Sequence, residues 1–290
     1  MTALAPQSRF ASEPDARPAV PVVHICPPRG WTHVALRDLW AYREVFYFLV
    51  WRDLKVRYKQ TALGIIWVVL QPVVTMLIFA VFFGRVMRVP SDDLPYALFA
   101  YAGLLPWLFF SKVVTQSASS VVSSANLITK IYFPRLLIPA AVVAAGLVDW
   151  AIAFVAFVPL VLWYGVPLAS TAVLVPMIAL LTTALALGAG FWLSSLNVRY
   201  RDIGAMLPLA MQLWMFATPI IYPLSMVPPS WRRWLLLNPL TGITEGMRGA
   251  LFAGALDWTA LGISAGVTAA VLVSGVLSFR RLETTFADVV

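Results

Sequence analysis

The sequence predicts an all-α integral membrane protein with six transmembrane helices, an amphipathic interface helix before the first, and short re-entrant helices between the fifth and sixth. Of its 290 residues, 61% are hydrophobic and only 12% are charged, whereas soluble domains carry about 25% charged residues. Several charge-free runs reach the roughly 20 residues that a helix needs to cross a bilayer. Basic residues lie beside these runs, as expected for loops at a membrane surface.

The N-terminal stretch, residues 1–30, contains six prolines and few large apolar side chains, a composition typical of disorder. We expect it to form a disordered tail without a chemical role. The single cysteine, Cys26, lies in this tail and excludes an intramolecular disulfide. No apolar run suited to a cleavable signal precedes the first span, so that span is expected to direct insertion.

Residues 31–61 combine apolar and basic side chains at near-helical spacing. Such a helix is expected to lie in the plane of the membrane interface, with its apolar face in lipid and its arginines among phosphate groups. An ordinary soluble amphipathic helix is the alternative. The immediate onset of an apolar span weakens that alternative.

Six apolar segments follow within a membrane domain of residues 62–280, ahead of a C-terminal segment, 281–290. The first span carries no charge and corresponds to about 32 Å of helix. Between the fifth and sixth, residues 223–254 are apolar but are interrupted by several prolines, so short re-entrant or interfacial helices are expected. The expected spans are residues 63–83, 96–110 with an extension past Lys112 left open, 136–164, 171–196, 203–222 and 259–279.

The link from Ser111 to Arg135 is rich in serine and threonine and is too polar for lipid. We expect it to lie in water or inside protein. Lysine and arginine counts give the orientation, because sixteen lie on the side of both termini and five on the other. Basic loops stay in the cytoplasm, so both termini are expected there. The net charge of +8 reflects these flanking residues, and no basic recognition motif points to nucleic acid.

No catalytic machinery is recognisable in the sequence. Both histidines precede the first span, and no HExxH, CxxC, GxGxxG or GxxxxGK[ST] motif occurs. We expect no enzyme activity, no metal site and no cofactor bound by this chain, so that any ATP that drives it is bound by another chain. The adjacent Asp92 and Asp93 are explained as a solvated turn.

Asp149 is the only charged residue well inside a predicted span. Intramembrane acids line cavities, pair with bases or mark ion paths, so a structural polar contact and a role in substrate binding or gating both remain open. A count from Arg135 places Asp149 about 21 Å along its span, nearer the outer interface than the centre.

Five stretches of the chain carry longer motifs. They are WRDLKVRYKQTALGIIW from Trp51, followed by Gln71–Pro72; GLLPW from Gly103; SANLITKIYFPR from Ser124; LNVRYRD from Leu196; and NPLTGITEGMR from Asn238. In this order they resemble the permeases of polysaccharide ABC exporters of the ABC-2 type, which move O-antigen, galactan or teichoic-acid chains across the bacterial inner membrane. The resemblance covers most of residues 36–280, and the longer Pro-rich tail is its main departure.

The resemblance implies a transport subunit rather than an enzyme. Two copies would form a homodimer with the pore at its two-fold axis, and two copies of a nucleotide-binding ATPase subunit, which holds ATP and Mg, would drive export of a lipid-linked polysaccharide. The re-entrant helices would be periplasmic. Alternatives are an ABC-2 permease for capsule, drug or other lipid cargo, an intramembrane enzyme acting on polyprenyl-linked lipids, and a passive channel that needs no ATPase.

The resemblance also implies roles for particular residues. The substrate entrance would comprise Arg52, Lys55, Arg57, Lys59, Leu63 and Gly64, with the basic side chains suited to a pyrophosphate or to anchoring on anionic lipid. The contacts that couple the chain to the ATPase would comprise Ser124, Asn126, Lys130, Pro134 and Arg135, within a coupling helix over 117–135, and Arg199, Arg201 and Asp202. Channel or gate candidates are Trp67, Tyr101, Trp107, Asp149, Glu245 and Arg248, of which the last two, three positions apart on a helix, are expected to pair.

Overall fold

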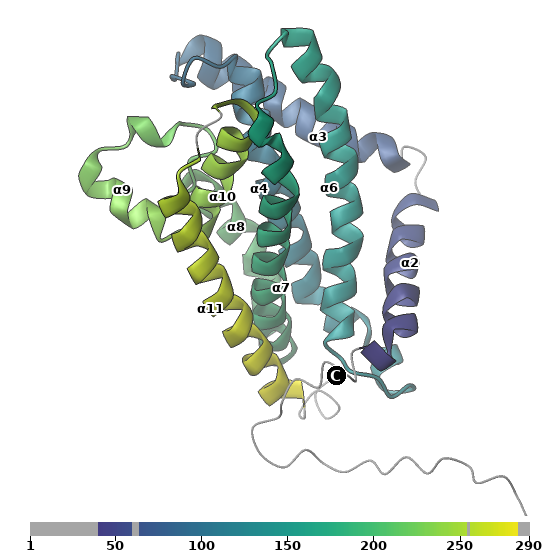
Figure 1. The fold of residues 1–290 in the computed structure, drawn as a ribbon. Coiled ribbons are helices and arrows are strands. Elements are labelled where there is room, and N and C mark those ends of the chain that lie inside the picture. The colour runs from purple at the N-terminus through teal and green to yellow at the C-terminus, as the bar shows by residue number, and fades with distance from the viewer. Residues whose placement is uncertain (1–39, 60–63, 254–255, 284–290) are drawn as a thin grey trace, which may run out of the picture. The chain divides into compact units, whose positions relative to one another are not determined.

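The computed structural model describes residues 40–59, 64–253 and 256–283, which all belong to one compact unit, Ala35–Val290. The predicted tail, Cys26, Leu63 and nearly all of the predicted C-terminal segment lie outside the described residues. Every regular element within these ranges is a helix (Figure 1). The structure therefore agrees with the all-α class.

Five helical segments in the described ranges are long and apolar enough to cross a membrane. They match the first, second, third, fourth and sixth predicted spans, and each exceeds the roughly 20 residues that a bilayer core requires. The segments are α3 (Gly64–Phe79) with η1 (Ala80–Val86), α4 (Tyr96–Ser123), α6 (Leu137–Tyr164), η2 (Ser170–Leu174) with α7 (Val175–Arg199), and α11 (Trp258–Glu283).

The fifth predicted span, 203–222, is not a helix of span length. In its place α8 (Asp202–Phe216) has 15 residues, about 22 Å, which is short of a hydrocarbon core of about 30 Å. The chain then continues in turns up to Tyr222. Pro219 explains the break, because proline lacks the N–H that a helix needs and disfavours helical backbone in the residue before it.

Helix α4 continues well beyond the predicted end at Phe110, as far as Ser123. Its polar side chains are accommodated because they bond to their own helix: the Ser120 hydroxyl donates to the Ser117 carbonyl at 2.7 Å and Thr115 to Ser111 at 2.8 Å. In the most apolar part of α4, 83% of the residues are buried inside the protein. The extension past Lys112 that the sequence left open is therefore present, and the first part of the predicted coupling helix continues α4 with Ser117 and Ser120 buried.

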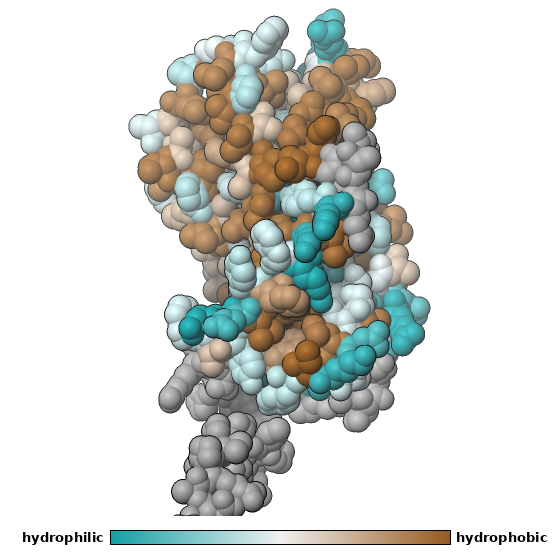
Figure 2. Space-filling view, turned by 90° about the vertical axis from the view of Figure 1, so that its right-hand side faces the viewer, coloured by the Kyte–Doolittle hydropathy of each residue, from teal (hydrophilic) through white to brown (hydrophobic). Residues whose placement is uncertain are grey.

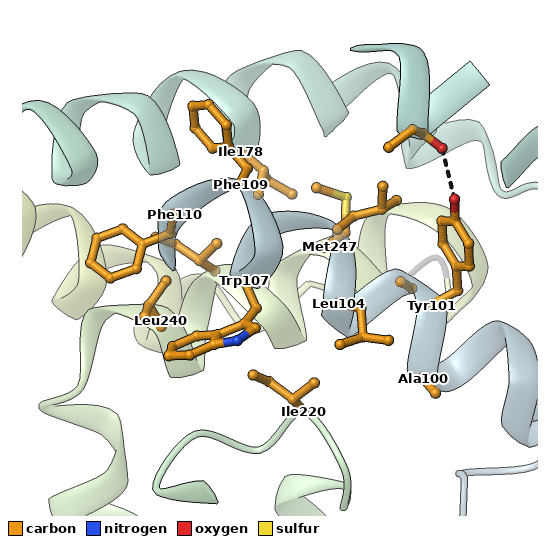
Figure 3. Packing of buried hydrophobic residues seen from close by; sticks show 14 of the residues in the cluster. Ala100, Tyr101, Leu104, Trp107, Phe109, Phe110, Ile178, Ile220, Leu240 and Met247 are labelled. Carbon is orange, nitrogen blue, oxygen red and sulfur yellow. Dashed lines mark hydrogen bonds between the residues drawn. The ribbon is translucent and has the colours of Figure 1, made fainter. Parts of the chain in front are cut away.

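The core surrounds α4, which contacts α3, α6, α7, α8 and α10. Tyr101, Leu104 and Phe110 of α4 are completely buried, and Trp107 lies near Leu240 and Ile220 (Figure 3). Because lipid tails are as apolar as leucine, helices in a membrane associate mainly through such packing and through polar contacts.

Helices α7 and α11 pack with their backbones in contact. A Cβ atom on Gly188 would lie 2.7 Å from the backbone Cα and N atoms of Leu272, and one on Gly275 would overlap the Gly188 carbonyl. Only glycine permits this approach, as at the small-residue interfaces of other membrane helices.

An interface helix is expected to lie across the end of the bundle. Helix α2 (Arg43–Lys59) instead runs beside the lower part of α6 (Figure 1). In its first half, Leu49 is buried in a cluster that contains Leu137, and near its end Arg57 contacts Asp149. Apolar residues also occupy the opposite side, where Phe48 and Trp51 are exposed. This two-sided distribution explains why α2 lies beside α6 and not across the end of the bundle, since one apolar face packs on α6 and the other points away from the protein.

The region between α8 and α11 contains the short helices α9 (Pro229–Leu236) and α10 (Pro239–Arg248), as predicted. Asn238 begins α10 by accepting a hydrogen bond from the Leu240 N–H at 3.1 Å, the usual role of an N-cap residue. The link before α4 contains Asp92 and Asp93, both in the left-handed region with φ of 48° and 63°. Aspartate tolerates this conformation in turns, in line with the predicted turn.

Candidate functional site

Asp149 is the centre of a polar cluster that joins three helices. Its Oδ2 accepts hydrogen bonds from Arg57 Nη1 of α2 and from Lys112 Nζ of α4, the latter at 2.9 Å, and its Oδ1 accepts one from the Tyr58 hydroxyl. Arg57 Nη2 also donates to Gln116 Oε1 at 2.8 Å. We call Arg57, Tyr58, Lys112, Gln116 and Asp149 the Asp149 cluster.

The carboxylate is buried, with only 8% of its side chain exposed, whereas the Lys112 side chain is 35% exposed. Asp149 is the thirteenth of the 28 residues of α6, so it lies near the middle of the helix. The count from Arg135 had placed it nearer the outer interface. A small cavity of about 50 Å³, lined by residues of α3, α4 and α6, borders Lys112 and Asp149.

Burial, and then the bond to Asp149, raise the pKa of Tyr58 above its ordinary value. Its hydroxyl therefore stays protonated at physiological pH and remains a donor to the carboxylate. Two cations and a phenol thus satisfy one acid, which is the arrangement that makes a charge tolerable at membrane depth. The cluster can bind three helices together, and it holds no activated nucleophile.

The predicted substrate-entrance residues do not form a single patch. Arg57 belongs to the Asp149 cluster, whereas Arg52 pairs with its neighbour Asp53 at 2.8 Å. Lys55 and Lys59 are exposed, and Gly64 is the first residue of α3. Figure 2 shows the side of the molecule on which α2 and α6 lie, where apolar residues cover the upper half and hydrophilic residues gather in the lower half. Lys55 and Lys59 lie in the half of α2 that leads into α3, where their exposed side chains are available to anionic groups.

The first predicted coupling segment follows α4 directly. Ser124 is buried, and Asn126 and Lys130 are exposed around the four-residue helix α5 (Ala125–Ile128). Exposed apolar side chains follow, with Ile131 at 55% and Tyr132 at 71%. The predicted coupling helix over 117–135 therefore divides into the end of α4, α5 and turns that include Pro134.

Arg135 fixes the end of this segment to the last turn of α11. Its backbone N–H donates to Glu283 Oε1 at 3.1 Å, and its guanidinium donates to the Glu283 carbonyl at 2.5 Å. Arg199, Arg201 and Asp202 lie at the junction of α7 and α8, all exposed. Both predicted coupling segments lie at the same end of the bundle (Figure 1).

Glu245 and Arg248 form the expected ion pair, at 2.8 Å. Arg248 is buried and also donates to the carbonyls of Phe99, Pro219 and Ile220 at 3.2, 2.8 and 2.7 Å. Burial raises the pKa of Glu245, and Arg248 partly offsets that rise. The pair therefore stabilises the break after α8, an additional role that the spacing of the two residues does not reveal.

Two of the aromatic channel candidates lie in the core of the chain. Tyr101 is fully buried, stacks on Phe157 at 4.9 Å and donates to the Ala153 carbonyl at 3.1 Å (Figure 3). Trp107 is 3% exposed and meets the edge of Trp214. Trp67 on α3 is 57% exposed. Of the three, only Trp67 has a side chain at the surface of the chain.

Sequence reasoning missed the partners of Asp149. Spacing along the sequence does not identify Arg57, Tyr58 and Lys112 as its hydrogen-bond partners. Lys112 offered a signal, because a base within one span often pairs with an acid in another. Lys112 and Gln116 are also four positions apart on α4, so they share a face. Among the described residues, no group of three or more potential metal-ligating side chains occurs.

The sequence of this chain is similar to those of known membrane transport proteins. The family model described as "ABC-2 type transporter" matches residues 44–252. The chain is similar to the O-antigen export system permease protein RfbA of Myxococcus xanthus, with 32% identity over 75% of this chain and 84% of that protein. A protein of the same name from Klebsiella pneumoniae is 30% identical over 82% and 92% of the two chains. The polysialic acid transport protein KpsM of Escherichia coli is 24% identical over 80% and 91%.

Proposed function

The chain belongs to the ABC-2 type transporter family, and from this premise we propose that it is the permease subunit of an exporter that moves an O-antigen-type, lipid-linked polysaccharide across the bacterial inner membrane. The observation that carries the proposal is the similarity to two O-antigen export permeases over at least three quarters of the chain. The membrane helices agree with it, as does the lack of a phosphate-binding loop in the sequence.

The proposed topology has six crossings and both termini in the cytoplasm. In it, α8 and the turns that follow form the fifth crossing, and α9 and α10 are re-entrant on the periplasmic side. The domain division remains residues 1–30, 31–61, 62–280 and 281–290. The end of the bundle that carries Lys130, Arg135, Arg199 and Arg201 is then cytoplasmic, as the positive-inside rule requires.

The proposed partners are two copies of an ATPase subunit, which bind ATP and Mg, and a second copy of this chain. The exposed apolar residues Ile131 and Tyr132, beside Lys130, suit docking into a groove of the ATPase. Arg199, Arg201 and Asp202 offer a second contact. Helix α3 is largely exposed, because only 17% of the residues in the most apolar part of this span are buried. It therefore retains surface for lipid or for the second copy at a pore.

The bases Arg52, Lys55 and Lys59 are proposed to meet the pyrophosphate of the cargo near the junction of α2 and α3, at Leu63–Gly64. Compact cations and planar guanidinium groups bind phosphate oxygens well. Trp67, Glu245 and Arg248 are retained as candidates near the path or its gate. Tyr101 and Trp107 are proposed to act through the packing of α4.

A capsule polysaccharide is the second candidate cargo, because the polysialic acid transport protein KpsM is also similar over most of the chain. An ABC-2 permease for a drug or another lipid would share the same helices. An intramembrane enzyme acting on polyprenyl lipids needs clustered acids near the headgroups, and Asp92 with Asp93 lie in a turn instead.

The test is to deplete the protein in cells and compare surface-labelled glycan with total extractable lipid-linked glycan. We expect surface glycan to fall while lipid-linked glycan accumulates inside, and chemical analysis of the accumulated glycan would identify it as O-antigen or capsule. Unchanged surface glycan in cells without a redundant exporter would contradict the proposal.

A further inference from the structure

The Asp149 cluster joins the two helices that flank the first coupling segment. Lys112 lies on α4 before the helix ends at Ser123, and Asp149 lies on α6 after the helix begins at Leu137. The two stretches are about 17 Å and about 18 Å of helix, or roughly three turns each. The ion pair therefore connects α4 and α6 at nearly equal distances from residues 124–136.

The same carboxylate also holds the N-terminal helix. Arg57 and Tyr58 both donate to Asp149, and Arg57 donates to Gln116 on α4 as well. These two residues immediately precede Lys59, where α2 ends. The contact therefore lies just before the 60–63 link into α3, while α4 and α6 lead to the coupling segment.

Breaking this cluster is unfavourable because it leaves charges without partners. Asp149 has 8% and Arg57 18% of the side chain exposed, so neither can exchange its partner freely for water. Removal of one member of a buried ion pair leaves the other uncompensated. The three helices are therefore expected to move together at this level while the carboxylate is present.

We propose that Asp149 is a positioning residue that transmits motion between the coupling segment at residues 124–136 and the junction of α2 with α3. The proposal rests on the proposed function, which gives those two regions their roles. Asp149 acts through Arg57, Tyr58 and Lys112 and does not contact the cargo. Loss of its charge uncouples ATP hydrolysis from cargo movement. Substitution of a purely structural residue would instead impair assembly and hydrolysis first.

The experiment uses the complete transporter, with its ATPase subunit, reconstituted in vesicles that contain the lipid-linked polysaccharide. ATP hydrolysed and polysaccharide moved are measured in the same vesicles. For Asp149→Asn, we expect hydrolysis close to that of the wild type but a fall of about tenfold in polysaccharide moved per ATP, within the usual range of coupling between sites.

Asp257→Asn is the matched control. Asp257 begins α11 by accepting hydrogen bonds from the backbone N–H groups of Thr259 and Ala260, both at 3.0 Å. Asparagine serves equally well at such a position. The same chemical change is therefore expected to leave the ratio of polysaccharide to ATP at the wild-type value.

A second pair of variants guards against misfolding of Asp149→Asn. Asp149→Asn combined with Lys112→Gln keeps the net charge of the cluster, so it avoids an added uncompensated charge, and we expect the same tenfold loss. Lys112→Arg keeps the bridge and is expected to retain the wild-type ratio.

Two results would overturn the inference. One is a wild-type ratio in Asp149→Asn or in the double variant. The other is loss of membrane insertion or of ATPase binding in both, which would make Asp149 purely structural. If wild-type vesicles themselves move no polysaccharide, the proposed function fails, and that outcome is visible before any variant is compared.

Discussion

Arg248 supplies hydrogen bonds that the backbone loses where α8 ends. The carbonyls of Pro219 and Ile220 lie in the break after α8 and accept from its guanidinium, which also stacks on Phe99 at 3.6 Å. One buried side chain thus satisfies several groups that would be costly to leave unpaired away from water.

Arg248→Met is predicted to destabilise the protein by about 3–5 kcal/mol, because Glu245 and the carbonyls lose their partner. Arg248→Met combined with Glu245→Gln should be less unstable, since no buried carboxylate remains. Thermal unfolding of the purified variants in one detergent checks both. Equal unfolding temperatures for wild type and Arg248→Met would exclude this role.

The contact of Gly188 with α11 yields a second prediction for a single residue. Gly188→Ala should cost about 1–3 kcal/mol, typical of overpacking, because the added methyl group would meet backbone atoms of Leu272. Gly262→Ala is the control, since nothing lies within 4 Å of its Cβ position, and it should gain up to about 1 kcal/mol of helix propensity. Similar unfolding temperatures for the two variants would contradict the close contact.

Among the elements, the segment between α4 and α6 is the one whose role is most open to direct test. Replacing Lys130 and Arg135 together by alanine is predicted to reduce the coupling of ATP hydrolysis to export while membrane insertion stays intact. The amount of polysaccharide exported per ATP hydrolysed and the amount of protein in the membrane measure the two effects. Wild-type export by this double variant would remove the coupling assignment.

The two single variants should differ. Lys130 is exposed, so Lys130→Ala should affect only docking of the ATPase. Arg135 also bonds to Glu283, and Arg135→Ala is therefore expected to lower the unfolding temperature in addition. Identical unfolding temperatures for the two variants would show that the bond to α11 contributes little.

Element boundaries were predictable where hydropathy changes sharply. The prediction failed where a segment is surrounded by protein and not by lipid. The bounds of α6 and α11 follow the apolar runs closely. Helix α4 continues past Phe110 because most of its serines and threonines bond within the helix and because Ser117 and Ser120 are buried in protein, which composition does not reveal. Helix α8 stops early because Pro219 ends it, although the residues stay apolar to Tyr222. The direction of α2 depends on the contact of Leu49 with α6, which spacing alone does not provide.

The site was predictable only in part, for a related reason. The Glu245–Arg248 pair follows from helical spacing within one segment. Asp149 stood out because a charge inside a span is rare, but its partners come from α2 and α4, which are far from it in sequence. Contacts between such distant segments depend on how the helices pack.

For the whole molecule, the predicted topology can be tested with single cysteines. Cys26 is the one natural cysteine and should react with a membrane-impermeant maleimide only after the cells are opened, because the N-terminus is predicted to be cytoplasmic. Ser225→Cys, in a Cys26→Ser background, should react in intact cells, since Ser225 is exposed in the region after α8. The reverse pattern would invert the topology and remove both cytoplasmic coupling assignments.

The backbone contact between α7 and α11 has a consequence for how this protein changes shape. An interface of interdigitated side chains can shift by exchanging rotamers, but an interface with Gly188 against Leu272 has no side chain at that point to rearrange. Sliding or tilting there would drive main-chain atoms into one another. These two helices therefore act as a fixed frame at this level, and a change of shape is easier at more lightly packed helices such as α3.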